Sequence, residues 1–363
     1  MTDVVVIGGG IAGCTTAYYL ASDGVDVTLL EQFELNSLAS GANAGSLHAQ
    51  IQPEPFADYG DAWARRYQAA LPFYQASISL WMRAAEQLGK DLGIAQDGGL
   101  LIASSEQEMR QIEAKAAYER AAGLQIDLLG AGDLQRVAPY ITADALGAAY
   151  CPIEGKADPL RATAAFGEGA QKQGARIYEN CSVTAIEAGT SGYDVVTDRG
   201  KFSARRIVNA AGGQVGRIAA MLGDHIDCAS FPIQLSVTER LEPLIGHLVY
   251  SAAAMLTLKQ TQVGTAVIGG GWPACEGSGG RARVSGKSLR GNLQAAVAVV
   301  PALASVGIVR SWAAFVNGNR SWLPIIGELP GNPGVFVNYV PWMGFSGAPA
   351  AGRITASLVQ GLK

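Results

Sequence analysis

Three glycines near the N-terminus have the spacing of a loop that holds a phosphate group. They form the pattern Gly8-x-Gly10-x-x-Gly13. In such a loop the first glycine permits a tight turn, the second lets the backbone approach a pyrophosphate, and the third lets the next helix pack closely. Further along the chain, the carboxylate of Glu31 can accept hydrogen bonds from both hydroxyl groups of a ribose. These residues predict a dinucleotide site, and Glu31 disfavours a dinucleotide with a 2′-phosphate.

The surrounding sequence places this loop between a strand and a helix, as the chemistry requires. Residues 4–7 are a short apolar run, which predicts a buried parallel strand. Residues 11–22 predict a helix that Gly24 stops, and residues 25–30 predict a second strand that ends at Glu31. The start of the helix offers free N–H groups and a partial positive charge to a phosphate. A βαβ unit therefore opens the chain, and a glycine turn without a ligand is the weaker interpretation.

The rest of the chain continues to mix helices and strands. Residues 61–92 predict long helical segments with an interruption at Pro72. Residues 232–268 alternate as an antiparallel meander does, and residues 342–347 predict a glycine-rich loop. Further helices are predicted over 105–122, 159–173, 285–300 and 349–360, and further strands over 99–103, 183–187, 193–197, 206–210 and 334–337. Nucleotide-type segments occur at both ends of the chain, so we expect interleaved domains.

Composition excludes several classes of protein. Hydrophobic residues make up 49% of the 363 residues and charged residues 16%, so the chain can bury a large core and is not globally disordered. The net charge of −4 argues against a nucleic-acid binder. The five cysteines are widely spaced and there are three histidines, which argues against a disulfide framework and against a metal site.

We also expect no targeting signal. The N-terminus has no basic residue before its first apolar run, so we expect no signal peptide. The longest apolar stretch, residues 295–309, contains Pro301 and is too short to span a bilayer. We therefore expect a cytoplasmic protein without a transmembrane segment.

Specific patterns recur outside the first βαβ unit. They are Leu29-Leu30-Glu31-Gln32, Ala39-Ser40-Gly41-Ala42-Asn43-Ala44-Gly45-Ser46, Ile207-Val208-Asn209-Ala210-Ala211-Gly212, Leu323-Pro324-Ile325-Ile326-Gly327, Gly334-Val335-Phe336-Val337 and Ala348-Pro349-Ala350-Ala351-Gly352. Over nearly its whole length the chain thereby resembles the FAD-dependent amino-acid oxidase family, which includes D-amino-acid oxidase, glycine oxidase and monomeric sarcosine oxidase. Some of its sarcosine oxidases attach the flavin through a cysteine in the C-terminal third. No cysteine follows Cys275, so we expect non-covalent FAD.

The resemblance implies an α/β fold with two domains. A discontinuous Rossmann-type FAD-binding domain is expected over residues 1–60, 145–225 and 310–363. An α+β substrate domain, built on a mostly antiparallel sheet, is expected over residues 61–144 and 226–309. The FAD contacts that the resemblance implies are Gly8, Gly10, Ile11, Ala12, Gly13, Glu31, Gln32, Ser40, Ala42, Asn43, Ala44, Gly45, Ser46, Val183, Ala210, Ala211, Gly212, Gly344, Phe345, Ser346 and Gly347.

The chain departs from the family where the substrate carboxylate is bound. Glycine oxidase and D-amino-acid oxidase use an arginine in a Gly-Leu-Arg-Pro segment, and Val316 takes its place here. A second arginine of glycine oxidase corresponds to Trp342. A buried carboxylate without a cation is costly, so either another residue binds it or the substrate has none there. Arg320 is our first candidate for this clamp, against the alternative of a surface arginine.

Three more residues are candidates for contacts beside the flavin. In the family, the segment 39–46 passes beside the flavin, and we call it the flavin loop. His48 follows this loop, and it either contacts the substrate, acts electrostatically on the flavin, or is a packed or surface histidine. Trp342 and Met343, with Phe345, would form an apolar wall beside the ring, and a pure core role is the alternative. The predicted catalytic set is therefore His48, Arg320, Trp342 and Met343, with no metal.

The resemblance implies hydride transfer from a C–N bond of an amino or imino acid to flavin N5. The segments 44–48 and 341–344 look most like the FAD subunits of heteromeric bacterial opine or D-hydroxyproline dehydrogenases. No Lys or Arg lies between Gly334 and Ala351, and a cation would favour reaction with oxygen, so we expect a dehydrogenase with a partner subunit as a possible electron acceptor. The alternatives are a free-standing oxidase of glycine, sarcosine or D-amino acids, and an electron-transfer subunit whose substrate site lies on its partner.

Overall fold

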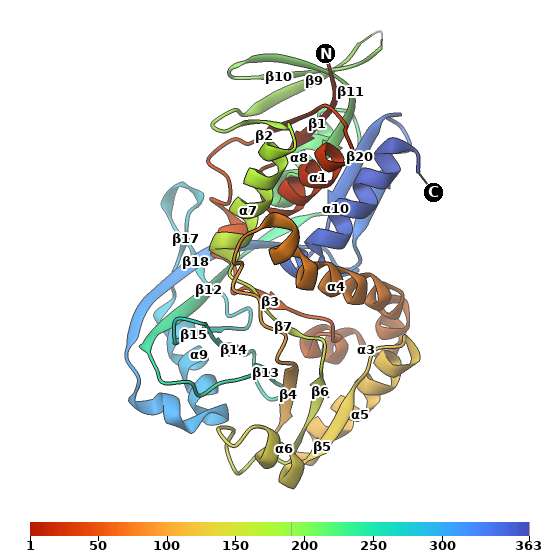
Figure 1. Cartoon of the computed structure of the whole chain (residues 1–363). Helices are drawn as coiled ribbons and strands as arrows, with labels where there is room; N and C mark the ends of the chain where they lie inside the picture. Colours follow the sequence, from red (N-terminus) through yellow and green to blue (C-terminus); the bar gives the residue numbers. More distant parts are fainter. Residues whose placement is uncertain (190, 363) are drawn as a thin grey trace.

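The protein is built around two large β-sheets. The computed structural model describes residues 1–189 and 191–362. Both sheets have eight strands, and they occupy the upper and lower halves of Figure 1. Within the described residues, no helix is both long enough and apolar enough to cross a bilayer.

The first sheet contains the predicted βαβ unit. Its main path runs β19-β20-β11-β1-β2-β8, and β9 and β10 extend it beside β11. The central pairs are parallel, whereas β19 and the β9–β10 hairpin are antiparallel. The strands are β1 (Thr2–Ile7), β2 (Val27–Leu30), β8 (Arg176–Tyr178), β9 (Val183–Gly189), β10 (Gly192–Thr197), β11 (Gly200–Asn209), β19 (Ile325–Glu328) and β20 (Val335–Tyr339). Residues from both ends of the sequence thus meet in one sheet, which confirms the Rossmann-type fold.

The second sheet is mostly antiparallel, as predicted. Its order is β18-β12-β15-β14-β13-β4-β6-β5, and only β4 and β13 pair in parallel. The strands are β4 (Gly99–Ala103), β5 (Asp127–Gly130), β6 (Gly147–Cys151), β12 (Ala229–Arg240), β13 (Leu248–Ser251), β14 (Thr257–Gln260), β15 (Thr265–Gly269) and β18 (Ile308–Gly318). The predicted meander over 232–268 is therefore reordered, because β15 lies between β12 and β14.

Helices cover the sheets and connect their strands. They are α1 (Ile11–Ser22), α2 (Ala39–Ala42), α3 (Pro53–Tyr67), α4 (Leu71–Leu88), α5 (Glu106–Ala121), α6 (Ala131–Val137), α7 (Pro159–Lys172), α8 (Val215–Ala220), α9 (Gly286–Val299) and α10 (Gly344–Gln360). The short elements are β3 (Ser46–Leu47), β7 (Gly155–Lys156), β16 (Cys275–Glu276), β17 (Ala282–Arg283) and the 3₁₀ turns Gln68–Ala70, Gly212–Gln214, Ser278–Gly280 and Pro301–Ser305. Helix α1 is buried because α7 and α10 pack against it (Figure 1).

The last helix begins earlier than the sequence predicts. It starts at Gly344, so the expected loop over 342–347 is mostly helical and Pro349 lies inside the helix. A proline cannot donate the backbone hydrogen bond to the carbonyl four residues before it. That carbonyl, of Phe345, instead accepts from Trp81 Nε1 at 3.2 Å. A side chain of α4 thus replaces the missing donor, which local sequence patterns cannot anticipate.

Two further boundaries differ from the sequence prediction. Helix α3 begins at Pro53 and bends at Gly60, whose φ is +65°, whereas the prediction begins at residue 61. Strands β6 and β18 lie in the second sheet, although the predicted division places 145–225 and 310–363 in the FAD-binding domain. Strand β6 is hydrogen-bonded to β4 and strand β18 to β12, both in antiparallel fashion, and these pairings place the two strands in the second sheet. The remaining domain division stays a prediction.

Candidate functional site

The glycine loop forms a tight turn between β1 and α1. Gly8 has a φ of +113°, and a Cβ atom there would lie 2.5 Å from the carbonyl oxygen of Ala210. A Cβ atom on Gly13 would overlap the carbonyl oxygen of Gly8. The glycines are therefore needed at these positions, because the turn, the helix and the loop after β11 approach one another closely.

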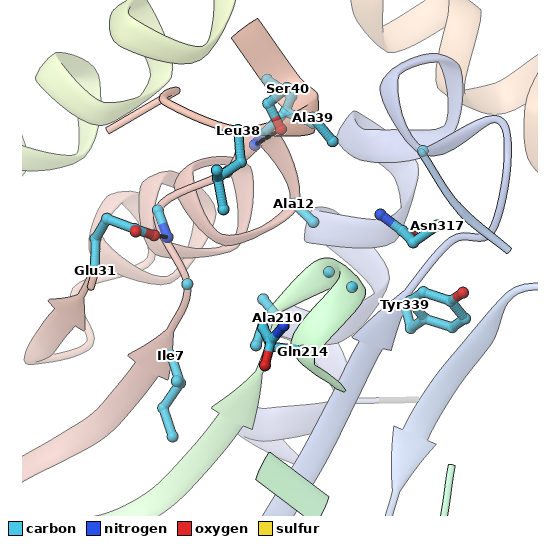
Figure 2. Close-up of a pocket in the computed structure, with 18 of the residues that line it drawn as sticks. Ile7, Ala12, Glu31, Leu38, Ala39, Ser40, Ala210, Gln214, Asn317 and Tyr339 are labelled. Atoms are coloured by element: carbon cyan, nitrogen blue, oxygen red, sulfur yellow. Dashed lines mark hydrogen bonds between the residues drawn. The ribbon is translucent and has the colours of Figure 1, made fainter. Parts of the chain in front are cut away.

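Backbone N–H groups at the start of α1 are available to a ligand. The Ile11 amide donates to Ser40 Oγ at 2.9 Å, and the Gly9 amide donates to Glu31 Oε2 at 2.6 Å. The amides of Gly10 and Ala12 have no hydrogen-bond partner within 1–189 and 191–362. Figure 2 shows Glu31 and Ser40 on the two sides of this turn. Free amides at a helix N-terminus are suited to hold a pyrophosphate.

A cavity runs from this turn across the ends of the parallel strands. Its walls come from the glycine turn, the segment 30–43, the loop after β11 and the segment 338–345. Glu31 lies in this wall beside the turn, where its carboxylate accepts from the amides of Gly9 and Phe33. An elongated dinucleotide fits this arrangement of free amides, a carboxylate and glycines without Cβ atoms. These residues therefore fit FAD.

A second cavity of about 530 Å³ adjoins the first. Ala39, Asn43, Val316, Trp342 and Phe345 line both cavities, so the two spaces meet. The second sheet supplies one wall of the second cavity, and the flavin loop with the start of α10 supplies another. A ligand that extends from the first cavity would therefore end beside a pocket large enough for a second molecule.

Aromatic side chains form a rigid wall of the second cavity. The Trp342 ring stacks on Phe231 at 5.0 Å and on Trp322 at 4.8 Å between ring centroids. Trp342 Nε1 also donates to the Asn319 carbonyl at 3.0 Å. A Cβ atom on Gly318 would overlap the Trp342 ring, so the strand must carry glycine there. Trp342 is thus fixed in place by its neighbours.

His48 lies in the same cavity and belongs to a buried hydrogen-bond network. Its Nδ1 is 2.7 Å from the hydroxyl of Tyr250, which in turn lies 2.7 Å from Glu154 Oε2. Glu154 is fully buried. Burial, with a smaller effect from Lys259, lowers the pKa of His48 to about 3, so this side chain is neutral at physiological pH.

No Lys or Arg lines the second cavity within the described part of the chain. Its ionisable lining residues besides His48 and Tyr250 include Glu54, and burial raises the pKa of the Glu54 carboxyl. A buried cation lies just behind the wall, because Lys259 Nζ donates to Ser46 Oγ at 2.7 Å. Burial lowers the pKa of Lys259 to about 7. The cavity itself therefore offers apolar surface, neutral polar groups and one carboxyl group.

The predicted site residues fall into three groups. The first cavity is lined by Gly8, Gly10, Ile11, Ala12, Glu31, Gln32, Ser40, Asn43, Val183, Ala210, Ala211, Gly212, Gly344 and Phe345, and the second by Ala42, Ala44, Ser46, His48, Trp342, Met343 and Ser346. Gly13, Gly45 and Gly347 line neither cavity. Arg320 is exposed and lies outside both linings, so the structure does not bring it to the cavity.

Sequence reasoning missed several polar residues of this site. Tyr250, Glu154 and Lys259 come from β13, the turn after β6, and β14. Only folding brings Tyr250 to His48, Glu154 to Tyr250 and Lys259 to Ser46. A buried strand that carries a lysine, as residues 257–260 do, was the available signal. The isolated Glu154 gave no local signal.

Comparison with known proteins identifies the family. The family described as "DAO: FAD dependent oxidoreductase" matches residues 3–358. The chain is 28% identical to the beta subunit of sarcosine oxidase from Arthrobacter sp, with 98% of this chain and 86% of that protein covered. It is 27% identical to an opine oxidase subunit of Rhizobium meliloti, with 92% and 87% covered.

A solved structure shows the same architecture. The crystal structure of glycine oxidase from Geobacillus kaustophilus superposes with a TM-score of 0.89 at 25% identity, covering 100% of this chain and 95% of that one. The family match, this likeness and a first cavity whose residues fit FAD agree. The chain belongs to the DAO family of FAD-dependent oxidoreductases.

Proposed function

We propose that this protein oxidises the C–N bond of an amino or imino acid, and that its substrate is a secondary amine such as an opine or D-hydroxyproline. The observation that carries the proposal is the second cavity, which adjoins the FAD cavity and has no Lys or Arg in its described lining. The names of the relatives, sarcosine oxidase, opine oxidase and glycine oxidase, support C–N chemistry.

The protein's own residues would bind and orient the amine. Bound FAD would accept a hydride from the substrate carbon at flavin N5. Trp342 and its stacked neighbours exclude water from one side of the cavity, and His48 offers a neutral polar group to the substrate. Exclusion of water strengthens each polar contact inside the site.

Glu54 favours a substrate with a second positive group. It is the carboxyl group in the described lining of the second cavity, at the start of α3. Glu54 is half-buried, and its backbone hydrogen bond offsets only part of the rise that burial causes in its pKa. A cationic group of the substrate would offset more of that rise. Among secondary amines, octopine carries such a group in its guanidinium.

We also propose that the protein acts as a dehydrogenase. A positive charge near the flavin would favour electron transfer to oxygen, and the described cavity lining contains no Lys or Arg. His48 is neutral at physiological pH. The electrons would then leave to a partner protein, in line with the names of two relatives, which describe them as subunits. A cytoplasmic location is part of the same proposal.

A free-standing oxidase is the second candidate, and one observation favours it. Lys259 Nζ donates to Ser46 Oγ, and Ser46 lines the cavity. Because burial lowers the pKa of Lys259 to about 7, a fraction of the molecules carries a charged Lys259 near neutral pH. This charge could assist reaction with oxygen.

Turnover by the isolated chain tests the proposed function. The FAD-bound protein is assayed with an artificial electron-accepting dye against octopine, D-hydroxyproline, sarcosine, glycine and D-alanine. We expect dye reduction with a secondary amine. Turnover with none of them would contradict the proposal and favour an electron-transfer subunit whose substrate site lies on a partner.

A further inference from the structure

A chain of buried side chains fixes the orientation of one amide beside the active cavity. Lys115 Nζ, which can only donate, lies 3.2 Å from Gln50 Oε1. The other end of that amide, Gln50 Nε2, therefore donates to Glu154 Oε2 at 2.8 Å. Lys115 is itself held by Glu119 at 2.5 Å. Lys115 thus determines that the NH₂ group of the Gln50 amide, and not its oxygen, points to Glu154.

Glu154 is surrounded by hydrogen-bond donors. Its Oε1 accepts from the backbone N–H groups of Ala49 at 2.6 Å and Gln50 at 2.9 Å. Its Oε2 accepts from Gln50 Nε2 and is 2.7 Å from the Tyr250 hydroxyl. Burial raises the pKa of the Glu154 carboxyl, and these hydrogen bonds reduce that shift without reversing it. The geometry favours the ionised form, because three N–H groups already donate to the two carboxylate oxygens.

An ionised Glu154 determines the direction of the next hydrogen bond. It can only accept, so the Tyr250 hydroxyl donates its single hydrogen to Oε2. The tyrosine oxygen can then only accept from His48 Nδ1, at 2.7 Å. His48 therefore carries its hydrogen on Nδ1. Its Nε2 then has a lone pair, and no hydrogen bond joins this atom to another described residue, whereas His48 lines the cavity.

We infer that His48 Nε2 accepts a hydrogen bond from the N–H group of the substrate amine, and that Tyr250 and Glu154 are positioning residues that keep this nitrogen unprotonated. The inference rests on the proposed function for the identity of its ligand. Nε2 binds the amine as a hydrogen-bond acceptor and does not take up its proton, in keeping with the low pKa of His48. An acceptor at this place also repels a carboxylate, so it sets the direction in which an amino acid enters.

The chain contains a matched control for this arrangement. Tyr140 and His247 form a second tyrosine–histidine pair, with the hydroxyl 2.8 Å from Nδ1, and neither residue lines the two cavities. The whole sequence contains three histidines, which are His48, His225 and His247. Removal of either tyrosine hydroxyl therefore perturbs a comparable bond, but only Tyr250→Phe perturbs the cavity.

Nuclear magnetic resonance of the FAD-bound full chain tests the tautomer without a substrate. Protein labelled with ¹⁵N-histidine shows in a long-range ¹H–¹⁵N spectrum which ring nitrogen is protonated, and His48→Gln assigns the signal. We expect the Nδ1–H tautomer for His48 in the wild type and a shift toward the Nε2–H tautomer in Tyr250→Phe. Tyr140→Phe should change only the His247 signal. An Nε2–H tautomer in the wild type would overturn the inference.

Kinetics with the best amine of the substrate panel provides the second arm. We expect Tyr250→Phe and His48→Ala to lower kcat/KM by about tenfold to a hundredfold, mainly through KM, because one hydrogen bond to the substrate is lost. His48→Gln should recover part of that loss, since its amide oxygen can accept, and Tyr140→Phe should match the wild type. Unchanged kcat/KM in Tyr250→Phe would overturn the inference. If no amine is oxidised, the proposed function fails, whereas the NMR result still decides the tautomer.

Discussion

Lys259 shows how the fold changes the chemistry of a single residue. It is buried, and its Nζ contacts Ser46 Oγ instead of a carboxylate. Burial, with a smaller effect from Lys156, lowers its pKa to about 7. An unfolded chain keeps this proton up to about pH 10. Between about pH 7 and pH 10 the unfolded state therefore binds more protons at this residue than the folded state does, so its contribution to stability rises with pH.

The prediction for Lys259 concerns the pH dependence of unfolding. In FAD-free protein, Lys259→Met should remove a contribution to the free energy of unfolding that increases from about pH 7 to about pH 9. Urea denaturation at several pH values measures the difference between variant and wild type. Lys201→Met is the control, because Lys201 is exposed and pairs with Glu187. An identical pH slope in Lys259→Met and the wild type would show that Lys259 titrates normally.

Glu54 leads to a prediction about substrate choice. If it pairs with a second positive group, Glu54→Gln should raise the KM for octopine by about tenfold, equivalent to roughly 1.4 kcal/mol, and leave the KM for D-hydroxyproline nearly unchanged. Asp61→Asn is a matched control on the same helix, because Asp61 is exposed and lines neither cavity. Steady-state kinetics with both amines decides. Equal changes for the two substrates would remove the pairing role of Glu54.

At the scale of elements, the β1–α1 turn is the part most open to sequence reasoning. Its strand, glycines and helix are adjacent in sequence, so their spacing alone predicts the geometry. The beginning of α10 was not predictable in that way, because Trp81 of α4 supplies the donor that Pro349 lacks. The His48–Tyr250–Glu154 contacts were missed for the same reason: they join segments that only the packed sheets bring together.

The turn also yields a direct test of FAD binding. A valine side chain at Gly10 would project into the space beside Ser40 Oγ, which lies 2.9 Å from a Cβ atom there, and would obstruct the pyrophosphate. We expect Gly10→Val to purify without flavin but with its far-ultraviolet circular dichroism retained. Gly132→Val on the exposed α6 is the control, because a Cβ atom there meets nothing within 4 Å. A yellow Gly10→Val protein with wild-type flavin content would refute this role of the turn.

For the whole molecule, the lining of the two cavities determines whether the reduced flavin passes its electrons to oxygen or to a partner protein. The proposed dehydrogenase should reoxidise slowly in air after reduction by its amine, because no Lys or Arg lines the described substrate cavity. Any residual reaction with oxygen that depends on Lys259 should weaken as pH rises through about 7, where its charge is lost. Stopped-flow mixing of the reduced protein with oxygenated buffer measures this rate. Reoxidation as fast as turnover, with stoichiometric hydrogen peroxide, would favour the free-standing oxidase.

The binding of FAD can be checked on the same protein preparation. Acid precipitation of the native protein should leave the yellow colour in the supernatant, as expected for non-covalent FAD. Absorbance of the supernatant and of the dissolved pellet gives the two fractions. Colour that stays with the pellet would reveal a covalent link.

The central claim is that an amine is oxidised in the cavity beside the FAD site. Anaerobic mixing of the FAD-bound protein with the panel of amines tests it most directly, since a single turnover needs neither oxygen nor a partner. The account predicts that a secondary amino acid bleaches the visible flavin absorbance and yields, after loss of the hydride, one cyclic imine or, where the imine is hydrolysed, one keto acid or aldehyde per flavin, whereas a matched hydroxy acid leaves the spectrum unchanged. Bleaching by the hydroxy acid alone, or by no member of the panel, would contradict it.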